Sequence, residues 1–280
     1  MDKIREKELK LFAANLRKNI LLEVFSASSG HPGGSLSIAD ILSYLYNVEM
    51  NVSPENPKDP NRDRFVLSKG HAAPAIYAAL ALKGFFDEKE LKLFRNINGF
   101  LQGHPDMKGV PGIDMSSGSL GQGISAACGM AIAGKKANKD YRVYAILGDG
   151  EIEEGQVWEA AMFAAHYKLD NLCAFLDLNG LQIDGKTSDV MSSAPADEKF
   201  KAFGWNVIVI DGHNFADIEK ALNEASATKG KPTMIVCNTV KGKGVSYMEN
   251  QASWHGSVPS EEQYNIAISE LDAAIAALED

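Results

Sequence analysis

The chain has 280 residues, of which 45% are hydrophobic and 23% are charged, and its formal net charge is −9 at pH 7. This length and composition are typical of a soluble globular protein with one large α/β domain or two small ones. The acidic balance and the scattered basic residues argue against a protein that binds nucleic acid or an anionic membrane.

The signals of export and membrane insertion are not found in the sequence. The start of the chain, from Met1, has no secretory pattern, and the longest apolar run, at 72–82, is too short to span a bilayer. The three cysteines lie far apart, without the spacing of a metal or redox motif. We therefore expect a cytoplasmic protein whose cysteines are small buried residues in a reducing compartment.

Hydrophobic periodicity predicts that helices and strands alternate along the chain. Helices are expected at about 6–26, 37–46, 72–83 and 87–94, after a glycine-rich loop up to about 133, and at about 154–167, 215–227 and 260–278. Short apolar runs predict strands at 64–67, 143–147, 172–178, 205–210 and 233–237. This order is typical of an α/β fold, so we predict one domain over residues 1–280, with an open, mostly parallel sheet flanked by helices.

Histidines gather on the loops between these elements. Five of the six adjoin a glycine, which is more typical of a loop that approaches a ligand closely than of a core position. We predict that four of them, on separate loops, share one cleft: His31, His71, His104 and His255. His166, inside a predicted helix, and His213, in a turn that caps a predicted helix, are interpreted as structural.

A glycine-rich loop at 118–123 opens a helix of small residues. Free backbone N–H groups and the helix dipole favour an anion at such a helix start. The pattern also resembles a dinucleotide-binding fingerprint, but no predicted strand runs directly into it, which weakens that interpretation.

Two turns in the middle of the chain carry the strongest chemical signal. Gly148-Asp149-Gly150 follows the strand at 143–147, and Asn179 follows the strand at 172–178, with a helix between them. Taken alone, Gly-Asp-Gly is equally typical of a plain turn. In a parallel crossover, however, both side chains lie at carboxyl ends of strands, where open sheets bind ligands. A carboxylate, an amide oxygen and backbone carbonyls suit Mg²⁺ or Ca²⁺, with a phosphate completing the shell.

The spacing of 30 positions between Asp149 and Asn179 resembles the signature of thiamine-diphosphate (ThDP) enzymes. Seven segments then resemble transketolase, in order along the chain. They are Ser-Gly-His-Pro-Gly at 29–33, Arg-Asp-Arg-Phe-Val-Leu-Ser-Lys-Gly-His at 62–71, Gly-His-Pro at 103–105, Gly-Ser-Leu-Gly-Gln-Gly at 118–123, Gly-Asp-Gly-Glu-Ile-Glu-Glu-Gly at 148–155, Asn-Gly-Leu-Gln-Ile-Asp-Gly at 179–185 and Trp-His-Gly at 254–256. The match covers nearly the whole chain but only the N-terminal, diphosphate-binding half of a transketolase. The chain thus resembles the N-terminal subunit of a split transketolase.

The resemblance implies a role for each matched residue. The metal, Mg²⁺ or Ca²⁺, is held by Asp149, Asn179 and the main-chain carbonyl of Leu181. The residues that the resemblance assigns to cofactor binding are His71, Gly118, Ser119, Leu120, Asp149, Gly150, Glu154, Asn179 and His255. The expected catalytic residues are His71 and His255, His31 and His104 at the substrate hydroxyls, and Glu154, which meets the catalytic glutamate of a neighbouring chain. One departure is Ser119, where the family usually has proline.

The resemblance also implies an activity and a partner. The expected reaction transfers a two-carbon ketol unit from a ketose phosphate to an aldose phosphate, and imidazoles with a pKa near 6.5 would exchange protons with the sugars. The family's pyrimidine-binding domain, with the glutamate that activates ThDP, has no counterpart among the matched segments. We therefore expect a second subunit that carries this domain, and an α₂β₂ heterotetramer.

Two alternatives remain open from the sequence. The first is the α subunit of a ThDP-dependent 2-oxo acid dehydrogenase, which also combines Gly-Asp-Gly with an asparagine. The segments at 29–33 and 118–123 favour transketolase over it. The second is a non-catalytic ThDP-binding module, against which the intact set of site residues argues.

Overall fold

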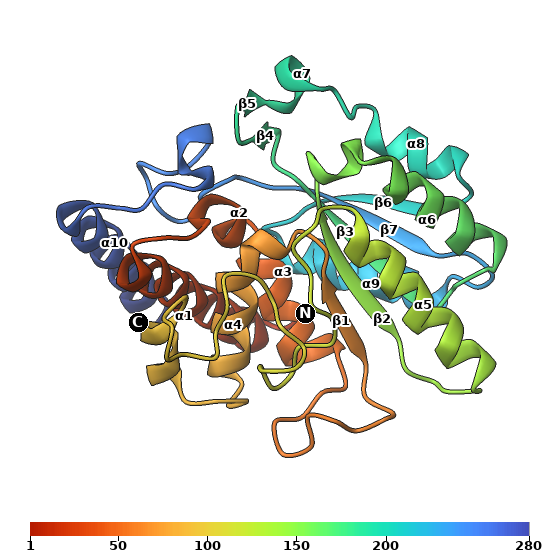
Figure 1. The fold of residues 1–280 in the computed structure, drawn as a ribbon, viewed down its shortest axis with the longest axis horizontal. Helices are drawn as coiled ribbons and strands as arrows, with labels where there is room; N and C mark the ends of the chain where they lie inside the picture. The colour runs from red at the N-terminus through yellow and green to blue at the C-terminus, as the bar shows by residue number, and fades with distance from the viewer. Residues whose placement is uncertain (280) are drawn as a thin grey trace.

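The computed structural model describes residues 1–279 and confirms the predicted open parallel sheet (Figure 1). Five strands lie side by side in the order β1-β2-β3-β7-β6, and every neighbouring pair is parallel. Their bounds are Arg64–Leu67 for β1, Val143–Gly148 for β2, Leu172–Leu178 for β3, Asn206–Asp211 for β6 and Thr233–Asn238 for β7. Each of these strands lies within one residue of its predicted position.

Helices connect the strands and cover the sheet. Their bounds are Lys3–Ala27 for α1, Pro32–Leu36 for α2, Ala39–Tyr44 for α3, Ala73–Leu82 for α4, Gln122–Lys136 for α5, Gly155–His166 for α6, Thr187–Val190 for α7, Ala196–Ala202 for α8, Phe215–Ala227 for α9 and Glu261–Glu279 for α10. The Asn214 side chain caps α9, as predicted. Ser260 and Gln263 form a capping box at the start of α10, each accepting the other's backbone N–H. Among residues 1–279, no helix combines the length and apolarity needed to cross a membrane.

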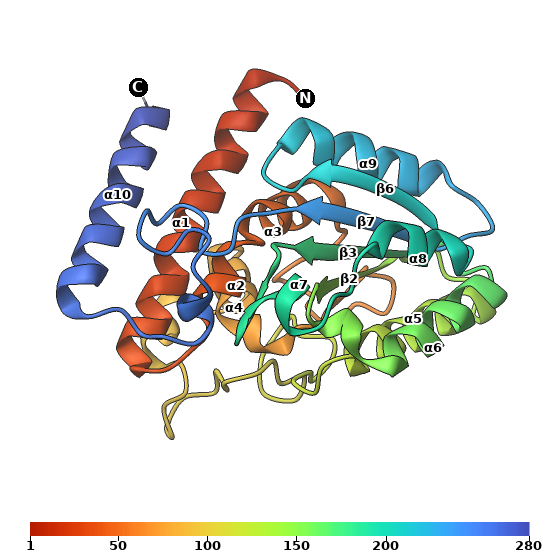
Figure 2. The same ribbon diagram turned by 90° about the horizontal axis from the view of Figure 1, so that it is seen from above.

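Both faces of the sheet are buried, and alternate residues of each strand face opposite sides. Along β2, Tyr144 and Ile146 pack with α1, α3, α4 and α9, whereas Ala145 and Leu147 pack with α5, α6 and α8. Figure 2 shows these helix layers on either side of the strands. Because both faces are covered, the strands are apolar throughout, which explains why short apolar runs predicted them well.

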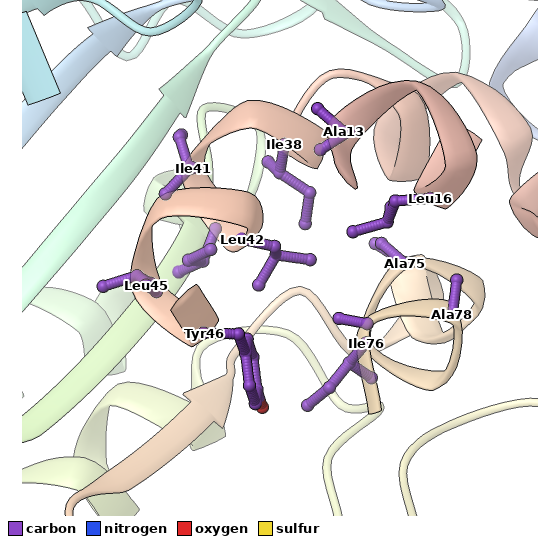
Figure 3. Close-up of a cluster of buried hydrophobic side chains, with 14 of the residues drawn as sticks. Ala13, Leu16, Ile38, Ile41, Leu42, Leu45, Tyr46, Ala75, Ile76 and Ala78 are labelled. Atoms are coloured by element: carbon purple, nitrogen blue, oxygen red, sulfur yellow. The ribbon is translucent and has the colours of Figure 1, made fainter. Parts of the chain in front are cut away.

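Helices α1, α3 and α4 form a tight layer against one face of the sheet (Figure 3). Leu16 of α1, Leu42 of α3 and Ile76 of α4 are at most 1% exposed. Helix α10 lies alongside α1 (Figure 2), and the rings of Phe25 and Tyr264 stack there at 4.3 Å. This packing holds the segment between β7 and α10, which passes over the carboxyl ends of the strands.

Three stretches differ from the prediction. The expected helix at 37–46 is divided into α2 and α3, and α2 begins earlier, at Pro32. Proline is well tolerated in a first helical turn, because N–H groups there have no intrahelical partner. The expected helix at 87–94 is a 3₁₀ helix, Glu88–Leu93. The stretch 181–202, for which nothing was predicted, contains α7, α8 and a hairpin of β4, Leu181–Gln182, and β5, Gly185–Lys186. These elements are too short for their periodicity to be recognised.

Candidate active site

The carboxyl ends of β2 and β3 border a cavity of about 240 Å³, at the place where the sequence predicts ligand binding. The predicted site residues that line it are His71, Leu120, Asp149, Gly150, Asn179, Leu181 and His255. Those that lie outside the lining are His31, His104, Gly118, Ser119 and Glu154. The fold therefore brings the predicted metal and diphosphate residues together, and leaves the predicted substrate and interface residues around them.

Asp149 is 2% exposed at the end of β2. Its carboxylate accepts hydrogen bonds from the backbone N–H groups of Gly180, at 2.6 Å, and Gly150, at 2.9 Å. The pKa of Asp149 is raised to about 6, first by burial and then by the nearby Asp177 carboxylate, which together outweigh the opposite effect of the two N–H groups and Lys241. Within residues 1–279, no Lys, Arg or His side chain forms an ion pair with Asp149. A bound divalent cation would supply the missing positive charge.

The two other predicted metal donors lie on the turn that follows β3. The Asn179 side-chain oxygen accepts the backbone N–H of Leu181 at 3.1 Å, and the Leu181 carbonyl accepts from Lys241 Nζ at 3.1 Å. Both oxygens keep a second lone pair for a metal. In residues 1–279, no three His, Cys, Asp or Glu side chains are gathered into a metal-binding group. The donor set is instead one carboxylate and two neutral oxygens, which suits Mg²⁺ or Ca²⁺ when a phosphate adds further oxygens.

Asp177 is a site residue that the sequence-based prediction missed. It is fully buried and accepts hydrogen bonds from Lys69 Nζ at 2.6 Å, Ser37 Oγ at 2.8 Å and the Asn179 amide at 2.9 Å. Burial raises the pKa of Asp177, but the charge of Lys69 and the hydrogen bonds from Lys69, Thr239 and Ser37 outweigh it, so the pKa is lowered overall. By holding the Asn179 amide nitrogen, Asp177 fixes which atom of that side chain is free to accept. A lone carboxylate inside an apolar strand was the signal that could have revealed it.

Lys241 is the second residue that was missed. It is 2% exposed, and no carboxylate forms an ion pair with it in the described part of the chain. Burial, with a further contribution from the neighbouring Lys69, lowers the pKa of Lys241 to about 8. Its Nζ contacts the Leu181 carbonyl and, at 2.9 Å, His255 Nδ1. An ammonium only donates, so this contact leaves the proton of the His255 ring on Nε2.

Three of the predicted histidines meet at one point. The ring centroids of His31, His71 and His255 lie 5.1 to 5.4 Å apart. Burial lowers the pKa of His31 to about 4 and that of His255 to about 3, with further contributions from Arg95 and Lys241 respectively. Burial also lowers the pKa of His71 far below its usual value. The structure brings these three rings together, and His71 and His255 line the cavity. The expectation that their imidazoles titrate near pH 6.5 is wrong, because burial lowers the pKa of all three.

The remaining predicted residues lie around this cluster. The His104 ring packs against Gly118, where a Cβ would come within 3.2 Å of it. Burial lowers the pKa of His104, and Arg95 lowers it further. Glu154 is exposed at the start of α6. His213 contacts Asp40 Oδ2 at 2.7 Å, away from the cavity, as expected for a structural histidine.

The glycine-rich loop is anchored differently from the prediction. Its Gly121 N–H donates to Glu151 Oε1 at 2.9 Å, and the Ile124 N–H, inside α5, donates to Ser68 Oγ at 3.1 Å. The expectation of free N–H groups that bind an anion at this helix start is therefore wrong for these two positions, because protein oxygens already satisfy them. The buried Glu151 also accepts the Gly148 N–H at 3.0 Å. It thereby ties the loop to the Gly-Asp-Gly turn and holds Leu120 at the cavity.

Comparison with known proteins identifies the family. The family model described as "Transketolase, thiamine diphosphate binding domain" matches residues 10–271. The chain belongs to the transketolase family. It is 48% identical over 257 residues to the 6-deoxy-6-sulfo-D-fructose transketolase subunit SqwG of Clostridium sp. (strain MSTE9), covering 92% of this chain and 94% of that one. It is 43% identical over 271 residues to one of the subunits of an apulose-4-phosphate transketolase from Phocaeicola vulgatus, covering 97% and 96%.

Longer transketolases match over part of their length. Human transketolase is 44% identical over 259 residues, which are 91% of this chain and 40% of that protein. The crystal structure of the Pichia stipitis transketolase with sedoheptulose-7-phosphate superposes with a TM-score of 0.87 at 30% identity, over 98% of this chain and 44% of that one. The chain thus spans less than half the length of these two transketolases. The predicted transketolase resemblance and enzyme class are confirmed, and the family matched is not that of the 2-oxo acid dehydrogenase alternative.

Proposed function

We propose that this chain is the diphosphate-binding subunit of a two-chain cytoplasmic transketolase. With ThDP and Mg²⁺, the enzyme transfers a two-carbon ketol unit from an anionic ketose to an aldose. The observation that carries the proposal is the cluster of three neutral histidines beside the buried Asp149 carboxylate. This arrangement places groups that exchange hydrogen bonds with sugar oxygens next to a carboxylate that needs a cation.

The residues at the cavity fit the cofactor. Asp149, Asn179 and the Leu181 carbonyl would hold the metal, and the Lys241 ammonium faces the same space with no carboxylate paired to it among the described residues. Gly150 leaves little spare room, since a Cβ there would lie 2.9 Å from Gln182 Oε1. When bound, ThDP supplies the nucleophilic carbon that accepts the two-carbon unit.

The histidines of this chain would act as neutral hydrogen-bonding groups. Because Lys241 donates to Nδ1 of His255, the Nε2–H of that ring is free to donate to a sugar oxygen on which negative charge develops. His31, half-buried beside His255, would meet a substrate hydroxyl, while its Nδ1 is buried without a hydrogen-bond partner in the described residues. At pH 7 a neutral ring can donate a hydrogen bond from one nitrogen and accept one at the other.

The chain also offers a surface for a partner. Helix α6 exposes Met162 and Phe163, which are 55% and 37% exposed, and Tyr167, directly after the helix, is 48% exposed. Glu154 lies at the start of the same helix. We propose that the subunit with the pyrimidine-binding domain packs on this face, so that its catalytic glutamate reaches Glu154, and that two such pairs form an α₂β₂ assembly.

The names of the relatives support an anionic sugar as substrate. One relative is named for a sulfonated fructose and another for apulose 4-phosphate, and both are named as transketolase subunits. The shared chemistry is a sugar that carries a sulfonate or phosphate group at the end remote from its reactive carbons. We propose a substrate of this class, with the choice between the two anions left to the assay.

The decisive experiment compares the purified chain with and without its partner. The partner is obtained by co-purification from the source organism and identified by mass spectrometry. With ThDP, Mg²⁺, a ketose phosphate donor and an aldose phosphate acceptor, we expect ketol transfer only when both chains are present. Full turnover by this chain alone would overturn the two-chain proposal, and no turnover by the assembled pair with any phosphorylated or sulfonated sugar would favour the non-catalytic alternative.

A further inference from the structure

Arg95 is a charged residue outside the cavity lining, beside the loops of His31 and His104, that the mechanism above does not use. It is exposed, and its φ of 58° lies in the left-handed region that residues other than glycine rarely adopt. The backbone N–H of Arg95 donates to the Leu101 carbonyl at 2.9 Å, which closes the turn around this conformation. This backbone conformation fixes the direction in which the side chain leaves the chain.

The guanidinium itself is seated between two loops. It donates to Ser29 Oγ at 2.8 Å and contacts the Gly103 carbonyl at 3.5 Å. A Cβ on Gly103 would come within 2.9 Å of Arg95 Nε, so the group lies against the bare Cα of that glycine. Ser29 stands two residues before His31, and Gly103 directly precedes His104. Arg95 thus bridges the two loops that carry the proposed substrate histidines.

The contacts with Ser29 and Gly103 do not neutralise the charge of Arg95. No Asp or Glu forms an ion pair with it among residues 1–279, and its hydrogen-bond partners are a hydroxyl and a carbonyl. Its positive charge reaches His31 and His104, since it adds to burial in lowering the pKa of both rings. A guanidinium presents five donors, so several N–H groups remain for a ligand.

We propose that Arg95 determines specificity by binding the anionic end of the sugar, a phosphate or sulfonate, whose reactive end lies at His31 and His255. The proposal rests on the transketolase function inferred above and extends it, because it assigns part of the recognition of the anion to this chain. A planar guanidinium with two parallel N–H groups matches a tetrahedral oxyanion better than an ammonium does. Because its contacts with Ser29 and Gly103 already hold the side chain, Arg95 would lose less conformational entropy on binding than a free side chain would.

The first test uses the assembled two-chain enzyme and two acceptors, glyceraldehyde 3-phosphate and glyceraldehyde. We expect Arg95→Gln to raise KM for the phosphorylated acceptor about tenfold, to leave kcat nearly unchanged, and to leave both constants for glyceraldehyde unchanged. Arg95→Lys keeps the positive charge but loses the two parallel N–H groups, so its KM for the phosphorylated acceptor should lie between those of the wild type and Arg95→Gln. Lys92→Gln is the matched control, because Lys92 is an exposed cation of the same segment and makes no ion pair in the described structure. A sulfonated acceptor of the same length compares the two anions.

An equal loss of activity with both acceptors, or a fall in kcat alone, would mean that Arg95 only holds the two loops in place. No change in either constant would mean that Arg95 has no role.

A second test does not depend on turnover. Calorimetry measures binding of an unreactive pentitol and its phosphate to the ThDP- and Mg²⁺-loaded pair. A selective loss of pentitol phosphate binding in Arg95→Gln supports the proposal even if the transketolase function itself fails. Equal binding of the two polyols by the wild type overturns it.

Discussion

The two sides of the cleft are built in different ways. On the diphosphate side, at the ends of the strands, Lys69 and Asp177 are buried, charged and bonded to each other and to protein oxygens. On the sugar side, His31, His104 and Arg95 lie on loops, where the rings are neutral and the guanidinium is exposed. This difference predicts which property a substitution on each side should alter. Changes on the first side should reduce folding stability and cofactor affinity, and changes on the second should reduce turnover or selectivity.

The largest effect is expected from breaking the buried ion pair. Asp177→Ala leaves the Lys69 ammonium, 2% exposed, without its counter-charge and removes the acceptor of Ser37 and Asn179. Removing one partner of such a pair costs about 3–5 kcal/mol of unfolding free energy. Urea denaturation followed by circular dichroism measures this.

A double variant separates charge from packing at the same place. Lys69→Met with Asp177→Leu removes both charges, and an apolar pair in place of a buried ion pair is often neutral or stabilising. We therefore expect the double variant to be more stable than Asp177→Ala, while cofactor affinity is lost in both. Equal losses of stability in the two proteins would show that the pair matters for its shape and not for its charge.

The next effect concerns Asp149 and has a defined pH dependence. The folded-state pKa of about 6 lies above the unfolded value of 3.8, so the fold favours the protonated acid. Its contribution to stability is complete below about pH 4 and is lost as pH rises through about 6. A shift of about two units corresponds to about 3 kcal/mol. Without ligand, Asp149→Asn should therefore be more stable than the wild type by up to about 3 kcal/mol above pH 6, and equal to it near pH 4.

Ligand addition should reverse this order. Mg²⁺ with ThDP should raise the melting temperature of the wild type above pH 6, because the metal supplies the charge that Asp149 lacks, and should have little effect near pH 5, where protons compete. Asp149→Asn should show no such stabilisation at any pH. Thermal unfolding with and without ligand across this range is the measurement, and normal ThDP binding by the variant would show that the metal lies elsewhere.

On the sugar side the expected losses are kinetic. His255→Ala in the assembled enzyme should lower kcat about a hundredfold, since a positioned donor at a charging oxygen is lost, while calorimetric ThDP affinity changes little. Because burial holds the pKa of His255 at about 3, the wild-type rate should show no inflection at pH 6.5 from this ring. The matched control is His213→Ala, which removes the contact with Asp40 and should lower stability more than turnover. If His213→Ala lowered turnover and His255→Ala lowered only stability, His213 would be the functional histidine and His255 the structural one.

The same contrast explains what the sequence could predict. The strands and the pairing of Asp149 with Asn179 follow from local patterns and from the rule that parallel strands end at one edge. The burial of Lys241 does not follow from local patterns. It arises because the loop that carries Lys241 packs on α2, which is distant in the sequence. The contact is so close that a Cβ on Gly33 would lie 3.0 Å from Lys241 Cγ. The low pKa of the histidines has the same origin. Their neutrality depends on burial by segments remote in sequence, which no periodicity reports.

The smallest effect on the isolated chain is expected outside the cleft, on the exposed face of α6. Met162 is 55% exposed, so Met162→Ser should change the unfolding free energy by no more than about 0.5 kcal/mol. If the partner packs there, the same change removes apolar contact area from the interface and should weaken association measurably in sedimentation experiments. Glu159→Gln, an exposed polar change on the same helix, is the control. Unchanged association would place the partner on another face. A large loss of stability would mean instead that the side chain supports the fold, and α6 would then belong with the buried side of the comparison.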